Sequence, residues 1–215
     1  MASELDYCCG GKQSFAEACI AKGFNSEQIL REIGEAARTS AADRDWQTAP
    51  LHELVTHIVE THHAYLKLDL PVLEARIDKV VAVHSARDPQ NLPRLAEVSR
   101  ALRSELECIS RKKKTFCFRS SSSTDRAELQ KTPVPRQPFG SIANPIAVME
   151  REHHGAGDAL EEIRALTGNY NPPPYACATV RALYAGLEAL EKDLHIHIHL
   201  ENNVLFPRAI ALEQA

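Results

Sequence analysis

The sequence predicts an all-α protein: a helical bundle preceded by a short, truncated helical unit. Three long segments carry apolar residues at helical spacing, and polar turns or prolines separate them from their neighbours. Stripes of this kind bury their apolar faces against one another. With 215 residues the chain can form one full core and a small appendage.

The first half of the chain divides into four parts. Residues 1–38 form a first unit, and residues 39–49 read as a polar linker. A long helix is predicted over 50–84. A second helix follows the Asp-Pro break and ends near residue 106.

The second half begins where the helical spacing of apolar residues ends. Residues 110–138 contain Arg-Lys-Lys-Lys, a serine run and three prolines, which is typical of a solvated linker. Helical periodicity returns over 141–167, and a proline-rich turn at 169–174 reverses the chain. The last helix is predicted over 175–205, with Pro207 where it should end. The bundle domain is thus expected over residues 50–215, interrupted by an atypical segment at 107–138.

The last predicted helix carries a candidate metal site. His197 and Glu201 are four residues apart, so they share one helix face, and the apolar stripe of the helix passes through both. Turning a carboxylate into an apolar core costs several kcal/mol unless something compensates it, and a buried cation would do so. The same spacing also occurs by chance on helices that bind nothing.

Two other helices strengthen the metal hypothesis because each turns a histidine inward. His153 lies on the apolar stripe of 142–166 and His63 on that of 51–84, with His62 one step off the stripe. Other polar side chains fall on faces expected to meet solvent: His154 on one helix, and Glu188, Glu191, Lys192, His195, His199 and Asn202 on the last one.

Composition excludes several protein classes. The net charge of -4 with interspersed signs argues against nucleic acid as a partner, and no run is long and apolar enough for a membrane span. The start of the chain shows no signal peptide, so a cytoplasmic location is expected.

The six cysteines do not suggest a disulfide framework in a chain of this size. Cys8 and Cys9 are adjacent and precede Gly-Gly-Lys, which favours a thiol or metal-contacting loop. Two small buried hydrophobic residues are the alternative interpretation.

Four stretches form long, specific signatures: Asp6–Lys12, Ser141–His153, Tyr170–Cys177 and Leu200–Arg208. On these stretches the chain resembles the iron-sulfur cluster repair family of di-iron proteins, whose main domain is hemerythrin-like and follows a small Cys-Cys domain. The resemblance covers roughly residues 5–106 and 139–210.

The resemblance implies a four-helix bundle that holds two non-haem irons through one histidine from each helix and two bridging carboxylates. On that pattern His63, His153 and His197 are terminal ligands and Glu201 is a bridge. Cys8 and Cys9 would then serve redox or delivery chemistry.

The function implied is repair of iron-sulfur clusters damaged by oxidative or nitrosative stress. The partners would be damaged iron-sulfur proteins and small ligands such as nitric oxide or oxygen, and a homodimer is left open. An iron-donating protein is expected rather than a turnover enzyme. The alternatives are a hemerythrin-like oxygen or nitric oxide binding or sensing protein and a non-functional frameshifted product.

The chain departs from the family pattern at its second bundle helix. That helix should carry His-x-x-x-Glu followed by Leu-Phe-Pro, but residues 108–119 read Cys-Ile-Ser-Arg-Lys-Lys-Lys-Thr-Phe-Cys-Phe-Arg. We therefore expect a mononuclear or poorly occupied centre. Codons compatible with residues 107–119, read one base out of frame, admit His-x-x-x-Glu-x-x-Val-Leu-Phe-Pro, so we hypothesise a frameshift that is undone before Phe139.

Two further departures concern the N-terminal unit and His84. Met1 stands only a few residues before the Cys-Cys signature, so the unit is expected to lack a helix. His84 matches a histidine that recurs in the family, but it lies 21 residues beyond His63. On one continuous helix that is roughly 32 Å, so both could reach the same irons only if the helix broke, with Pro71 as the candidate.

Overall fold

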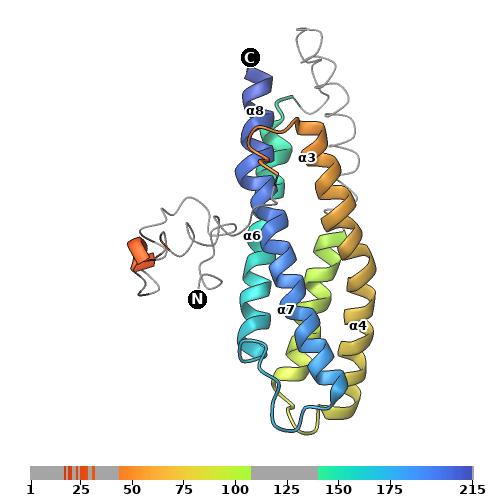
Figure 1. Ribbon diagram of the computed structural model, residues 1–215. Helices are drawn as coiled ribbons and strands as arrows, with labels where there is room; N and C mark the ends of the chain where they lie inside the picture. Colours follow the sequence, from red (N-terminus) through yellow and green to blue (C-terminus); the bar gives the residue numbers. More distant parts are fainter. Residues whose placement is uncertain are drawn as a thin grey trace.

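The computed structural model describes residues 44–107 and 140–214, together with scattered positions between 17 and 31. Within these residues the protein is a bundle of long helices connected by turns (Figure 1). This confirms the predicted all-α class. Cys8, Cys9, most of the first unit and the atypical segment from residue 108 to 139 lie outside the described residues.

The first long helix consists of α3 (Leu51–His57), a π-helical turn η2 (Ile58–His63) and α4 (Ala64–His84), which follow one another without interruption. The helix predicted over 50–84 is confirmed. The break considered at Pro71 does not occur, because α4 continues through this exposed proline. The irregular stretch is instead η2, which ends roughly two turns before Pro71.

The second helix covers residues 91–107 of the described chain. It begins after Asp88, whose side chain accepts a hydrogen bond from the Asn91 amide at 3.1 Å and thereby caps the first turn. The predicted start after the Asp-Pro break is therefore confirmed.

The third helix, α6 (Ala143–Leu166), ends in a sharp reversal. Gly168, Asn169 and Tyr170 all adopt positive φ angles between 55° and 58°. The Asn169 amide donates to the Arg164 carbonyl at 2.9 Å, which satisfies a carbonyl at the helix end. The predicted turn after residue 167 lies here.

The last helix runs through α7 (Ala178–His199), a second π-helical turn η3 (Leu200–Leu205) and α8 (Phe206–Gln214). The expectation that it ends near Pro207 is wrong. Pro207 is the second residue of α8, just after η3, so its missing amide falls where the hydrogen-bond register changes, and the chain stays helical.

Two apolar clusters form the core. The larger one joins α4, residues 91–107, α6 and α7. The smaller one joins α3, the start of α6, η3 and α8. Buried polar side chains lie between the two clusters. They come from α6 and from the two long helices that contain a π-helical turn.

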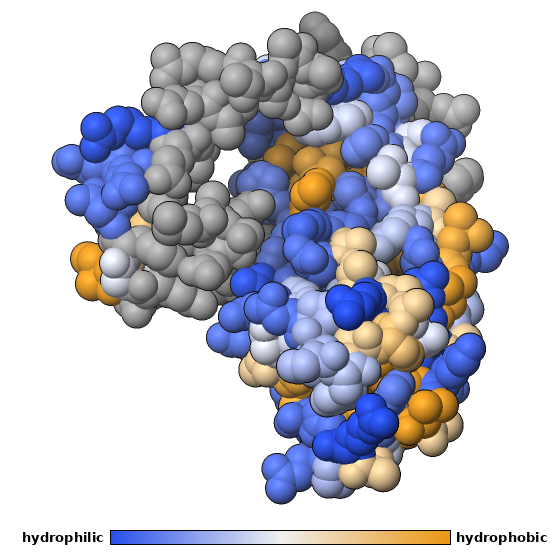
Figure 2. All heavy atoms as spheres, turned by 60° about the horizontal axis from the view of Figure 1, so that its bottom comes forward, coloured by the Kyte–Doolittle hydropathy of each residue, from blue (hydrophilic) through white to orange (hydrophobic). Residues whose placement is uncertain are grey.

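The outer surface is mixed. Figure 2 brings the lower end of the bundle forward and shows a mostly hydrophilic face with small, separate apolar groups. Among the described residues, no helix combines the length and apolarity needed to cross a bilayer.

Candidate metal centre

A layer of buried polar side chains lies between the two apolar clusters. It contains His62 and His63 from η2, His153 from α6, His197 from α7 and Glu201 from η3. Glu201 is only 1% exposed, and none of the four histidines exceeds 7%. Each helix therefore carries apolar residues on both sides of its contribution to this layer.

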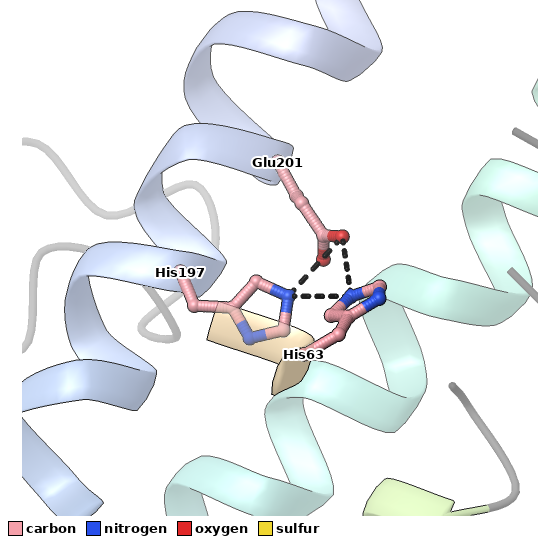
Figure 3. A group of neighbouring side chains, drawn as sticks. All are labelled: His63, His197 and Glu201. Atoms are coloured by element: carbon pink, nitrogen blue, oxygen red, sulfur yellow. Dashed lines mark hydrogen bonds and ion pairs between the residues drawn. The ribbon is translucent and has the colours of Figure 1, made fainter. Parts of the chain in front are cut away.

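Three of these side chains converge on one point (Figure 3). His63 Nε2 lies 3.2 Å from His197 Nε2, and Glu201 Oε1 lies 3.3 Å from His197 Nε2 and 3.9 Å from His63 Nε2. Two imidazole nitrogens and one carboxylate oxygen within 4.8 Å of one another could hold a metal ion.

The other oxygen of Glu201 faces a different helix. Oε2 lies 3.0 Å from His153 Nε2. The carboxylate thus has His63 and His197 on one oxygen and His153 on the other. Imidazole nitrogens from three helices therefore face the two oxygens of one buried carboxylate.

The tautomer of His153 supports a cation in this layer. Its Nδ1 lies 2.7 Å from Asn202 Oδ1, and because a carbonyl oxygen can only accept, Nδ1 must carry the hydrogen. In neutral His153, Nε2 then turns a lone pair toward the carboxylate. A bound cation or an added proton makes that contact favourable, so the residues present fit a metal such as non-haem iron.

The π-helical turns explain why sequence spacing missed His62. In a regular α-helix neighbouring residues point about 100° apart, and this reasoning placed His62 off the apolar stripe. The wider turn of η2 buries both neighbours. His62 Nδ1 lies 2.8 Å from Asp193 Oδ1, and its ring is parallel to that of His197 with centroids 5.4 Å apart. The adjacent His-His pair was the available signal.

Of the polar side chains expected on the solvent-facing sides of the helices, some are exposed and others are not. His154 is exposed, as predicted. His195 and His199 are half-buried, and burial lowers the pKa of His199. The expectation for Asn202 is wrong, because this half-buried residue holds His153.

The expectation for Glu191 is also wrong. Glu191 is buried, and its Oε1 lies 2.9 Å from an Arg164 guanidinium nitrogen. The pairing arises between α6 and α7, which helical periodicity alone does not reveal.

His84 lies away from the metal layer. It ends α4, 21 residues beyond His63 on a helix that does not break, and its Nε2 lies 3.4 Å from Cys177 Sγ. The expectation that an unbroken helix keeps it from the ligand set is confirmed. Cys8 and Cys9, the predicted thiol pair, lie outside the described residues.

Comparison with known proteins agrees with this geometry. The hemerythrin HHE cation binding domain matches residues 54–209, and a domain of unknown function, ScdA_N (DUF542), matches residues 2–37. The iron-sulfur cluster repair proteins YtfE of Citrobacter koseri and of Escherichia coli O157:H7 are each 40% identical over 212 residues. These alignments cover 98% of this chain and 89% of each relative.

Proposed function

The chain belongs to the family of YtfE-type iron-sulfur cluster repair proteins with a hemerythrin HHE cation-binding domain, and on this premise we propose that it is a non-haem iron protein that repairs damaged iron-sulfur clusters. The observation that carries the proposal is the buried Glu201 carboxylate, which has imidazoles from separate helices on its two oxygens.

These contacts support the ligand assignment that we propose. His63, His197 and Glu201 Oε1 would hold one iron, while His153 and Glu201 Oε2 would face a second. The described residues thus offer three donors at the first position and two at the second, so we expect tighter binding at the first. Bound iron would supply the exchangeable, redox-active metal that cluster repair needs.

The rest of the layer positions these donors. Asn202 holds His153 in the tautomer whose Nε2 lone pair faces Glu201 and could bind a metal. His62, anchored by Asp193, lies flat against His197 and limits its rotation. The apolar clusters on both sides keep bulk water from the charged groups.

The N-terminal thiols would supply the second part of the function. We assign redox or iron-delivery chemistry to Cys8 and Cys9 in an N-terminal domain of residues 1–38, joined by a linker at 39–49 to the bundle of residues 50–215. The ScdA_N match over residues 2–37 supports treating this region separately. Damaged iron-sulfur proteins would be the partners, and nitric oxide or oxygen the small ligands.

Repair can be tested directly. A [4Fe-4S] hydro-lyase inactivated by peroxide is incubated with the iron-loaded chain, with the metal-free chain, or with an equal amount of free ferrous iron. We expect the iron-loaded chain to restore activity faster than free iron, and expect Cys8→Ser and Cys9→Ser each to slow the recovery while leaving the bound iron unchanged.

The same experiment separates repair from the alternative of oxygen or nitric oxide binding without repair. A binding protein of that kind would hold iron and respond spectroscopically to the gas, yet restore no activity above the free-iron control. That outcome would refute the repair proposal while leaving the metal centre standing.

A further inference from the structure

A second polar cluster lies at the far end of the bundle from the metal layer. Cys177 is exposed and immediately precedes α7, and its Sγ lies 3.4 Å from Nε2 of His84, the last residue of α4. These ends of α4 and α7 lie together at the bottom of Figure 1. Along α4 the separation from His63 is roughly 32 Å, so the cluster is independent of the iron ligands.

The imidazole in this cluster is buried and held by its neighbours. His84 is only 7% exposed and is aimed at the sulfur through Nε2, while its buried Nδ1 has no hydrogen-bond partner among the described residues. Its ring packs against that of Tyr175 with centroids 6.0 Å apart, and the Arg87 guanidinium covers the same tyrosine ring at 5.9 Å. A buried imidazole whose described polar contact is an exposed thiol suits a proton acceptor for that thiol.

The N-terminus of α7 also lowers the pKa of the Cys177 thiol. Backbone amides at a helix N-terminus favour negative charge. The Val180 amide, followed by the His84 imidazole, lowers the pKa of the Cys177 thiol to about 7. Cys19, the other cysteine among the described residues, is fully buried and lacks this access to solvent.

We propose that Cys177 and His84 form a reactive thiol–imidazole pair, a modification site that takes up small disulfides such as glutathione disulfide by thiol–disulfide exchange. Exposure of the sulfur and burial of the imidazole behind it allow a small disulfide to approach from solvent while the proton leaves on the protein side.

The reaction balances without a further oxidant. The Cys177 proton moves to His84 Nε2, and the thiolate attacks one sulfur of the disulfide. A new bond forms to Cys177 as the original sulfur–sulfur bond breaks, and the released thiolate keeps that electron pair and takes the proton from His84. Cys177 ends in a mixed disulfide, and one glutathione leaves as the thiol.

The test measures the rate at which glutathione disulfide modifies Cys177 in the full chain at pH values between 5.5 and 9.5. Mass spectrometry of the peptide that contains Cys177 gives this rate. For the unaltered chain we expect a rate that rises with a midpoint near pH 7. A midpoint at the ordinary thiol value of about 8.5 would overturn the proposal without any variant.

Two histidine variants isolate the imidazole. His84→Gln should slow modification about tenfold at neutral pH, with the difference shrinking above pH 9, where solvent removes the proton. His154→Gln changes an exposed histidine and should leave the rate unchanged. A His84→Gln chain that melts normally and reacts like the unaltered one would refute the role of His84.

The pH profile must be assigned to the correct groups. The titratable and charged side chains around the pair are Arg87 and Asp88 after α4, Tyr175 in the loop and Tyr184 on α7, whose pKa is raised by burial and by Tyr175 and Asp88. The raised pKa of Tyr184 moves its ionisation further from the neutral range in which the thiol is followed. A midpoint near 7 that rises toward the ordinary thiol value in His84→Gln therefore belongs to the thiol and its imidazole.

Discussion

His153 Nε2 lies 3.0 Å from Glu201 Oε2, while Nδ1 of the same ring donates to Asn202. The other carboxylate oxygen faces His63 and His197. On the His153 side, the buried carboxylate therefore meets a lone pair of neutral imidazole, which is unfavourable until a cation or a proton lies between them. This contact supports the proposal that the polar layer holds metal.

Replacing the bridging carboxylate should remove the metal but not the fold. Glu201→Gln takes away the anionic donor and also the cost of burying it, so we expect iron affinity to fall about 100-fold or more while the metal-free chain stays folded. Glu188→Gln, on the same helix and more exposed, is the control. Iron per chain after dialysis decides the matter, and equal iron in both variants would contradict the assignment.

The two oxygens of Glu201 should differ in how tightly the iron beside each is bound. His197→Ala breaks the cluster of three donors and should abolish tight binding, whereas His153→Ala leaves that cluster intact and should retain one iron. His154→Ala is the neighbouring control, and it should bind like the unaltered chain because this histidine is exposed. Isothermal titration with ferrous iron under anaerobic conditions measures all three. Loss of the first iron in His153→Ala would show that the donors are grouped differently.

Restoring the expected second-helix motif should complete the centre. A chain in which residues 108–118 are replaced by the sequence of the shifted frame regains a histidine and a glutamate, and we expect it to bind two irons. The unaltered chain should hold no more than one iron tightly. Metal analysis of both proteins provides the comparison. Two tightly held irons in the unaltered chain, or a gene whose shifted frame offers no histidine codon, would defeat the frameshift hypothesis.

The ion pair between Arg164 and Glu191 should contribute to the stability of the fold because the Glu191 carboxylate is buried. Arg164→Met leaves the Glu191 carboxylate buried without its guanidinium, and we expect the free energy of unfolding to fall by about 3–5 kcal/mol. The double variant Arg164→Met, Glu191→Leu should recover most of this loss. Arg151→Met, at an exposed position of α6, should change stability by less than about 0.5 kcal/mol. Urea unfolding of the metal-free proteins provides these values.

Two glycines should respond to alanine with opposite signs. A Cβ on Gly186 of α7 would lie 2.6 Å from Cδ2 of the buried Leu73, so Gly186→Ala should destabilise the α4–α7 packing by about 1–2 kcal/mol. A Cβ on Gly155 of α6 would meet its nearest neighbour only at 3.7 Å. Gly155→Ala should therefore gain about 0.5–1 kcal/mol from helix propensity. Thermal melts of the pair test the close approach of α4 and α7.

Much of the fold could be predicted from the sequence because amphipathic periodicity is a local property. The helices over 50–84, 141–167 and 175–205 are present, and His63, His153, His197 and Glu201 are all buried, because each lies on its own apolar stripe. The inward direction of a side chain follows from its position relative to neighbours three and four residues away. No other helix needs to be known for that step.

The tertiary structure decided what those side chains meet. Periodicity could not show that η2 would bury His62, that Asn202 would orient His153, or that Arg164 would draw Glu191 inside. Each of these depends on contacts between helices distant in sequence. The sequence by itself determined that the apolar stripes turn inward, together with the polar residues that lie on them. Packing of the apolar clusters determined the separation and register of the helices, and those set which oxygen of Glu201 faces which imidazole.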